Sequence, residues 1–71
     1  MKTNNAEAFG KAVRNRRKEL HYTQAYLTEM TGISASFLSD LENGKETAEL
    51  GKSITIANLL GMDVFVEVRG R

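Results

Sequence analysis

Residues Thr23–Gly44, TQAYLTEMTGISASFLSDLENG, contain two short helical patterns separated by a break at a glycine. Thr23 is a suitable N-cap for the first helix, because its hydroxyl can accept a hydrogen bond from an otherwise unpaired backbone N–H. Gly32 can take the left-handed backbone conformation in which helices commonly end, so the chain can reverse there. Ser34 is placed to cap a second helix, which Gly44 ends. Two short helices joined in this way predict a helix-turn-helix.

The chain has 71 residues, enough for one small domain with a limited core. It contains no cysteine and one histidine, which excludes disulfides and zinc sites of the usual kind. No apolar run approaches the roughly 20 residues that span a bilayer, and the first ten residues lack the apolar core of a secretory signal. Neither a Ser/His/Asp set nor a phosphate-cradling glycine loop is present. We therefore expect a soluble, cytoplasmic protein that is not an enzyme and needs no cofactor or metal.

The net charge is only +1, but the charges are unevenly distributed. Residues 1–22 contain six Lys and Arg against two Glu, whereas residues 23–50 contain one Lys against five acidic residues. The segment with the helix-turn-helix pattern is therefore acidic. This composition argues against a strong nonspecific attraction of that segment to the phosphates of DNA.

Two charged residues fall on apolar stripes that should face the core. Arg17 lies four residues after Val13 and three before Leu20, on the inward stripe of a first helix. Glu42 lies four residues after Leu38, on the buried edge of the second motif helix. Two inward charges of opposite sign are most simply reconciled by pairing, so we predict a structural salt bridge between Arg17 and Glu42. Removal of one partner would strand a buried charge at a cost of about 3 to 5 kcal/mol.

A fourth helix follows, for which Thr47 is a candidate N-cap. Its apolar residues cover more than one face, and they are Leu50, Ile54, Ile56, Ala57, Leu59 and Leu60. A helix that is apolar over more than about 100° covers its own core with one side and a partner with the other. We therefore assign part of this set, Ile56, Leu59 and Leu60, to a dimer interface.

The stretch MDVFVEV at residues 62–68 has the composition of a β-strand, with β-branched and aromatic residues in near alternation. A lone strand leaves its backbone donors and acceptors unpaired, so we predict that it pairs with its counterpart in a second copy. This divides the chain into a helix-turn-helix domain at residues 1–61 and a dimerisation strand at residues 62–71. The strand residues that we assign to the dimer interface are Val64, Phe65, Val66 and Val68.

Several stretches of the chain specifically resemble a known protein family. VRNRRKELHYTQ and the spacing TQ..L....GIS...L..LE.GK resemble the XRE/Cro-type helix-turn-helix family of phage repressors and bacterial regulators. GKETAELGK followed by ANLLGMDVFVEV is similar to HipB-like antitoxins, which couple that domain to a short C-terminal strand. The resemblance implies an all-α, lambda-repressor-like bundle of four to five short helices, with one C-terminal β-strand pairing across a dimer. It also implies a bacterial protein associated with the nucleoid.

In that family the first motif helix lies over the DNA backbone and the second enters the major groove. Gln24 matches the glutamine that anchors the first helix to phosphate, and we include the neighbouring Thr23 in this contact. Asn43 and Lys45 match positions that contact the backbone after the recognition helix. The positions that match those facing base edges are Ser34, Ala35, Ser36 and Ser39.

The chain departs from the family pattern in its helix packing and in the residues available to contact DNA. Thr28 stands where the family usually has alanine, and it fits there only if its hydroxyl finds a carbonyl. The base-facing positions hold no Arg, Lys, Gln or Asn, which are the residues that make bidentate base contacts. Asp40 would repel phosphate. We infer that affinity depends on helix N-termini, backbone amides and hydroxyls, and that a dimer engages two half-sites about one helical turn, roughly 34 Å, apart.

The favoured interpretation is a dimeric, sequence-specific DNA-binding transcriptional repressor of antitoxin type. It would bind double-stranded operator DNA, autoregulate its operon and hold a HipA-like kinase toxin in an inactive complex, with no membrane or small-molecule partner. One alternative is a stand-alone phage or bacterial XRE-type repressor without a toxin. A second is a protein-interaction module that has lost DNA binding, which the acidic middle segment keeps open.

Overall fold

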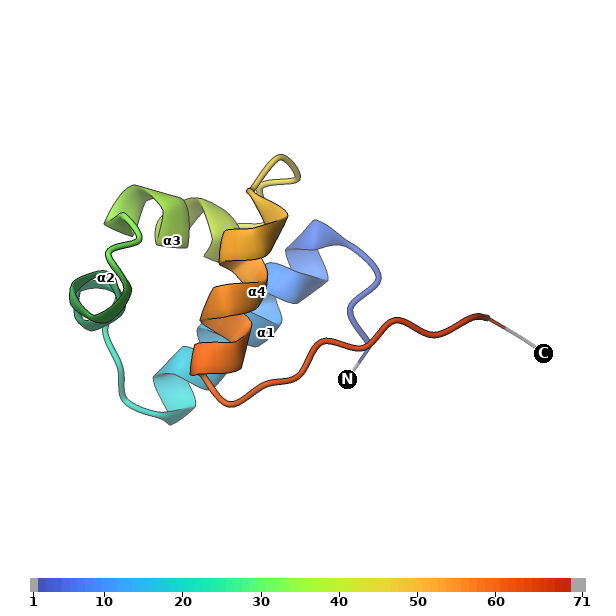
Figure 1. Ribbon diagram of the computed structural model, residues 1–71, viewed down its shortest axis with the longest axis horizontal. Helices are drawn as coiled ribbons and strands as arrows, with labels where there is room; N and C mark the ends of the chain where they lie inside the picture. The colour runs from blue at the N-terminus through green and yellow to red at the C-terminus, as the bar shows by residue number, and fades with distance from the viewer. Residues whose placement is uncertain (1, 70–71) are drawn as a thin grey trace.

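The structure, a computed structural model, describes residues 2–69 and contains four helices within them. Their bounds are Ala6–Glu19 for α1, Gln24–Thr31 for α2, Ala35–Glu42 for α3 and Leu50–Leu59 for α4. The helices pack into one bundle, in which α4 crosses in front of α1 and the C-terminal segment extends away to one side (Figure 1). The Cα radius of gyration is 12.1 Å. A compact chain of this length has about 11 Å, so the extended segment accounts for the excess.

Short-range capping sets where the first three helices begin. Asn5, Thr23 and Ser34 each accept a hydrogen bond from the backbone N–H three residues later, at 2.8, 3.0 and 3.0 Å. Gly32 ends α2 with φ at 76°, in the left-handed region. The predicted caps and turn of the helix-turn-helix are therefore confirmed.

The cap of α4 differs from the prediction. Glu49, and not Thr47, precedes the helix and accepts hydrogen bonds from the N–H groups of Gly51 and Lys52, at 2.7 and 3.0 Å. A carboxylate is well suited to this position, because its charge also interacts favourably with the positive end of the helix dipole. Sequence patterns favour Ser, Thr, Asp or Asn at the N-cap, so they indicate Thr47 rather than a glutamate.

All four helices contribute to one hydrophobic core, whose buried residues are Val13, Leu27, Leu38, Leu41, Ile56 and Leu60. Two of them correct the predicted dimer interface, since Ile56 is 0% exposed and Leu60 is 1% exposed. A 71-residue chain has so little apolar material that its last helix must contribute its main apolar side chains to the core. Leu59 is 38% exposed and remains available to a partner.

Gly10 lies where the backbone of α1 comes close to the end of α3. It is buried, and a Cβ at this position would overlap the carbonyl oxygen of Leu41. A glycine inside a helix costs about 1 kcal/mol relative to alanine, so its use here is explained by the close contact between the two helices. The contact brings α3 near enough to α1 for Arg17 to reach Glu42.

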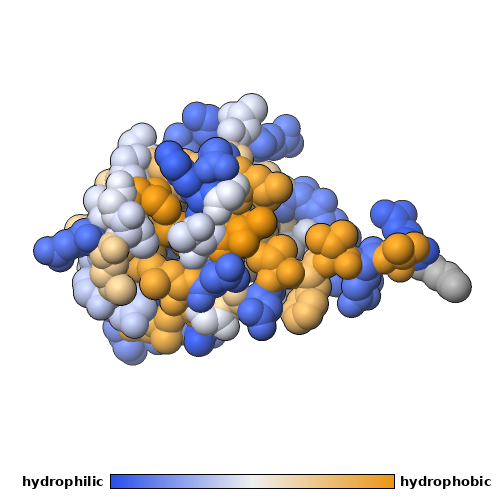
Figure 2. Space-filling view, viewed as in Figure 1, coloured by the Kyte–Doolittle hydropathy of each residue, from blue (hydrophilic) through white to orange (hydrophobic). Residues whose placement is uncertain are grey.

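The segment after α4 is extended but forms no strand within the described residues 62–69. A strand needs the N–H and C=O groups of a second strand, and a single chain does not provide them here. The predicted pairing across a dimer therefore stays a prediction, and residues 70 and 71 of the predicted dimerisation strand lie outside the described residues. Val64 is 42% exposed, and the most exposed apolar residues of the segment are Phe65, Val66 and Val68. Apolar surface continues from the α4 side of the bundle along this segment (Figure 2).

No helix within residues 2–69 combines the length and the apolar character required to cross a lipid bilayer.

Candidate nucleic-acid interface

The helix-turn-helix is attached to α1 by a buried ion pair between Arg17 and Glu42. The Nε and Nη2 groups of Arg17 donate to the two carboxylate oxygens of Glu42 at 2.7 and 2.9 Å, which is a bidentate geometry. The remaining Nη1 group donates to the backbone carbonyl of Tyr22 at 2.8 Å. Arg17 is 9% exposed and Glu42 is 6% exposed. One arginine thus connects α1, the segment before α2, and α3.

The hydrogen bond to Glu42 raises the pKa of the Arg17 guanidinium above its usual range, with a further contribution from the charge of Glu42. Burial of the guanidinium acts in the opposite direction but is the weaker influence on the pKa. A raised folded-state pKa means that this stabilisation is present at every pH below the ordinary arginine pKa. It would be lost only in strongly alkaline solution, so Arg17 introduces no pH dependence near neutrality.

Gln24, the predicted phosphate anchor of α2, belongs to the same network. Its Nε2 group donates to Glu42 at 3.2 Å, and the side chain is half-buried. An amide nitrogen carries two N–H donors, so one remains for a phosphate oxygen near the start of α2. The bond to Glu42 fixes the direction in which that donor points.

Thr23 and Ser34 are exposed, and each uses its hydroxyl oxygen to cap a helix. A hydroxyl has one donor and two acceptor sites, so capping leaves the O–H free to donate. Both hydroxyls also lie at helix N-termini, where unpaired backbone N–H groups and the helix dipole favour anions. Thr23 can therefore hydrogen-bond to phosphate, and Ser34 to a base edge, while they keep their structural role.

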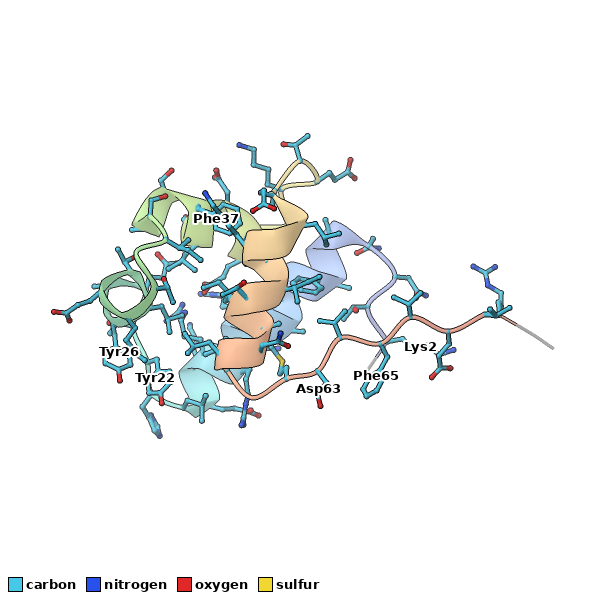
Figure 3. All side chains as sticks on the ribbon, in the orientation of Figure 1. Lys2, Tyr22, Tyr26, Phe37, Asp63 and Phe65 are labelled. Carbon is cyan, nitrogen blue, oxygen red and sulfur yellow. The ribbon has the colours of Figure 1, made fainter. Side chains whose placement is uncertain are left out.

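The outer face of α3 carries only short side chains. Ala35, Ser36 and Asn43 are exposed, and Ser39 is half-buried. The longer Phe37 lies on the side toward α4, packed against the core, with Lys52 Nζ 5.7 Å from its ring centroid (Figure 3). A close approach of the α3 backbone to the base edges is therefore possible, but the reach of its side chains is small.

Lys45, the predicted phosphate contact after α3, is held by Asp40. Its Nζ lies 3.3 Å from the Asp40 carboxylate, and the two side chains are 54% and 46% exposed. The backbone N–H of Lys45 also donates to the Asp40 carbonyl at 3.0 Å. A pair this exposed is weak, so DNA can break it, but the positive charge of Lys45 is partly neutralised before DNA arrives. No sequence pattern indicates this pair, although Lys45 is the only lysine between residues 23 and 50.

Thr28 does not meet the condition under which threonine fits this position, a hydroxyl bonded to a carbonyl. Its Oγ1 is buried and has no hydrogen-bond partner within residues 2–69. The neighbouring Thr31, in contrast, donates to the carbonyl of Leu27 at 2.7 Å and accepts from the N–H of Ile33 at 3.0 Å. An unpaired buried hydroxyl costs about 1 to 3 kcal/mol, so Thr28 weakens the packing of α2.

Arg16 has a role that no sequence pattern indicates. Its Nε donates to the carbonyl of Leu60 at 2.8 Å, and its Nη1 lies 3.3 Å from Glu19. The first bond satisfies a carbonyl at the end of α4, where a positive charge also complements the helix dipole. Arg16 therefore positions the point from which residues 62–69 leave the bundle.

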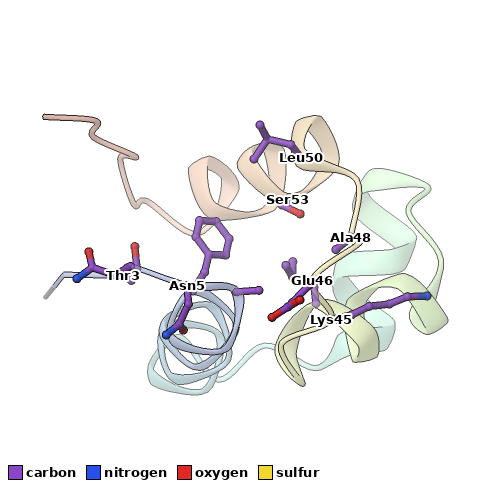
Figure 4. Close-up of a pocket in the computed structure, with 11 residues that line it drawn as sticks. Thr3, Asn5, Lys45, Glu46, Ala48, Leu50 and Ser53 are labelled. Atoms are coloured by element: carbon purple, nitrogen blue, oxygen red, sulfur yellow. The ribbon is translucent and has the colours of Figure 1, made fainter. Parts of the chain in front are cut away.

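A cavity of about 260 Å³ lies between the N-terminal segment, the α3–α4 connection and the first turn of α4, and Lys45 is one of its lining residues (Figure 4). Phe9, Leu41, Ala48 and Leu50 give it an apolar lining, and Asn5 and Ser53 are among its polar residues. Within the described part of the chain no group of three His, Cys, Asp or Glu residues could hold a metal ion.

The chain matches a helix-turn-helix family and is similar to two known proteins. A helix-turn-helix family model matches residues 13–65. An uncharacterised HTH-type transcriptional regulator, y4mF of Sinorhizobium fredii (strain NBRC 101917 / NGR234), is 36% identical over 61 residues, which is 86% of this chain and 80% of that protein. The ImmF control region 10 kDa protein of Bacillus phage phi105 is 33% identical over 57 residues, which is 80% of this chain but only 63% of the phage protein.

Two solved structures share the fold. A complex of a HipB variant with an O2 20mer has a TM-score of 0.87 and 21% identity, and covers 99% of this chain and 97% of the HipB chain. A HipB–O4 20mer complex also has a TM-score of 0.87, with 20% identity and 99% of both chains covered. Because the coverage is nearly complete, the similarity includes the extended C-terminal segment as well as the helices.

Replacement of Glu42 by Gln tests the buried ion pair. It leaves the Arg17 charge without a carboxylate, so the free energy of unfolding should fall by about 3 to 5 kcal/mol. The melting temperature should then fall by more than about 10 °C in a domain of this size.

The matched control is Glu19→Gln, because the ion pair of Glu19 with Arg16 is largely exposed and should be worth less than about 1 kcal/mol. The double variant Arg17→Met/Glu42→Leu should recover much of the loss, since no charge is left buried. An unchanged melting temperature of Glu42→Gln would refute the role of the pair.

Proposed function

Because the chain belongs to the XRE-type helix-turn-helix family of DNA-binding transcriptional regulators, we propose that it is a dimeric repressor that binds operator DNA near its own promoter. The finer part of the proposal is that it acts as the antitoxin of a HipA/HipB-like pair. The observation that carries the DNA-binding proposal is the capped α2–turn–α3 unit, held to α1 by the bidentate pair of Arg17 and Glu42. That pair orients both motif helices with respect to one surface.

At that surface α2 would lie over the backbone and α3 would enter the major groove. The phosphate contacts would come from the hydroxyl of Thr23, the free N–H of Gln24, and the side chains of Asn43 and Lys45. The positions that would face base edges are Ser34, Ala35, Ser36 and Ser39. Serine donates to or accepts from any base, so each half-site would discriminate modestly and in part through DNA shape.

This division of roles predicts different effects from different variants. Lys45→Glu should weaken binding to all duplexes about equally, whereas Ser36→Ala should change the preference at one base pair by about 1 kcal/mol. Asp40→Asn, which releases Lys45 and removes a charge that repels phosphate, should strengthen binding to all duplexes.

Fluorescence anisotropy with DNA from upstream of the gene and with a scrambled duplex separates these effects. No binding to either duplex at about 50 mM salt would leave only an interaction module. The reverse pattern, with uniform weakening by Ser36→Ala and altered preference by Lys45→Glu, would refute the assigned roles.

Dimerisation is proposed through residues 62–71 together with Leu59. The segment from Val64 to Val68 presents apolar side chains and unpaired backbone groups, a combination that favours pairing with a second strand. The similarity to the HipB chains extends over 99% of this chain and so supports the position of the segment. A two-fold dimer would place two motif units on one duplex, which offsets the weak reading by each one.

Sedimentation of Val66→Asp tests the interface. Val66 is 96% exposed in the single chain, so the variant should fold normally but form a dimer at least tenfold more weakly. Glu67→Gln at the neighbouring position is the control and should not change the dimer. A chain ending at Gly61 that still forms a tight dimer would contradict the proposal.

The antitoxin role is supported by the fold and by the resemblance of residues 44–68 to HipB-like proteins. Purification of the chain from its native cell under mild conditions should recover a kinase-like protein in a stoichiometric complex. The alternative of a stand-alone repressor is favoured by one observation, the similarity to the protein of a phage control region. Recovery of the chain with upstream DNA but without a second protein would support that alternative.

A further inference from the structure

The outer face of α1 carries a stripe of positive charge, composed of Lys11, Arg14 and Lys18. These residues are spaced by three and four positions, so they lie on one side of the helix. All three are exposed, while Val13 on the other side of α1 is buried in the core. Within residues 2–69 none of the three forms an ion pair, although Arg16, Arg17 and Lys45 all do.

The surface of the helix-turn-helix offers little positive charge of its own. Residues 23–50 contain one lysine against five acidic residues, and that lysine is paired with Asp40. Nonspecific affinity for DNA comes mainly from cations that release the counterions condensed on phosphates. Outside this segment Lys52 is one exposed cation, beside Phe37 of α3, and α1 carries three, of which Lys18 lies five residues before Thr23.

The stripe also ends close to the start of α2. His21 donates its backbone N–H to the carbonyl of Lys18 at 3.0 Å, and two residues later Thr23 begins α2. The N-terminus of α2 is the proposed phosphate contact, so the stripe ends within five residues of that contact in the chain. Lys11 and Lys18 are seven residues apart, which is roughly 10 Å along a helix. Several phosphates of a duplex lie within that length.

We propose that the stripe of Lys11, Arg14 and Lys18 is a second DNA-contacting surface, which binds phosphates of the duplex beside those contacted by α2. It supplies sequence-independent attraction, and the hydroxyls of α3 supply the discrimination. This inference rests on the proposed function, because it assumes that the α2–α3 unit meets DNA. It extends that function by placing the main electrostatic contribution on a helix outside the motif.

The test compares Arg14→Gln/Lys18→Gln with a control that removes two charges away from the motif, Lys2→Gln/Arg69→Gln. All four residues are exposed, so each variant should keep its fold and its melting temperature. The affinity of the full chain is measured from about 50 to about 200 mM KCl with the upstream duplex and with a scrambled duplex of the same length.

The slope of log K against log salt should become shallower by about two per protomer in the stripe variant. Over this fourfold range of salt the wild type should then lose about 12-fold more affinity per protomer than the variant. The loss should be equal on both duplexes, and the control should keep the wild-type slope.

Equal slopes for the stripe variant and the control would overturn the inference, because the effect would then be one of net charge alone. Unchanged DNA binding together with the loss of a co-purifying protein would also overturn it, and would assign the stripe to an acidic protein partner. Absence of wild-type binding to both duplexes is a different result, since it refutes the proposed function itself.

Discussion

The arrangement of the motif depends on one constraint, the requirement that two buried opposite charges satisfy each other. Arg17 uses three nitrogen groups, two on Glu42 and one on the carbonyl of Tyr22, and Glu42 also accepts from Gln24. Neither charge can turn to solvent without disturbing the core beside it. The pair therefore specifies the relative position of α1, α2 and α3 more than it adds to the free energy of unfolding. The contact at Gly10 makes this position reachable.

The resulting surface positions its hydrogen-bonding groups precisely, but its attraction to DNA is weak. Hydroxyl groups at Thr23 and Ser34 serve as caps and retain a donor, and the one lysine of residues 23–50 is paired with Asp40. Such a surface is well oriented but has little electrostatic attraction of its own. A second copy and a separate source of positive charge are two independent ways to compensate. Both would leave the short side chains of α3 free to discriminate without holding the complex together.

Local features were predictable from the sequence because their causes are local. The N-caps Thr23 and Ser34 and the turn at Gly32 each depend on residues within one helical turn. The pair of Arg17 and Glu42, although 25 residues apart, was also predictable, because each charge interrupts an apolar stripe in a chain with few alternatives. The choice of Glu49 over Thr47 as a cap was not predictable, since it depends on how the α3–α4 connection approaches α4.

The sequence by itself determined the four helices, the helix-turn-helix and the buried pair, because periodicity, capping and stranded charges are properties of the chain alone. Tertiary structure decided which apolar residues of α4 are exposed and available to a partner. Ile56 and Leu60 belong to the core, while Leu59 is partly exposed, and periodicity cannot show which side of a helix with apolar residues on more than one face meets the rest of the domain. Tertiary structure also decided the close contact at Gly10 and the bond from Arg16 to the end of α4. These depend on the distance between helices, which no local pattern encodes.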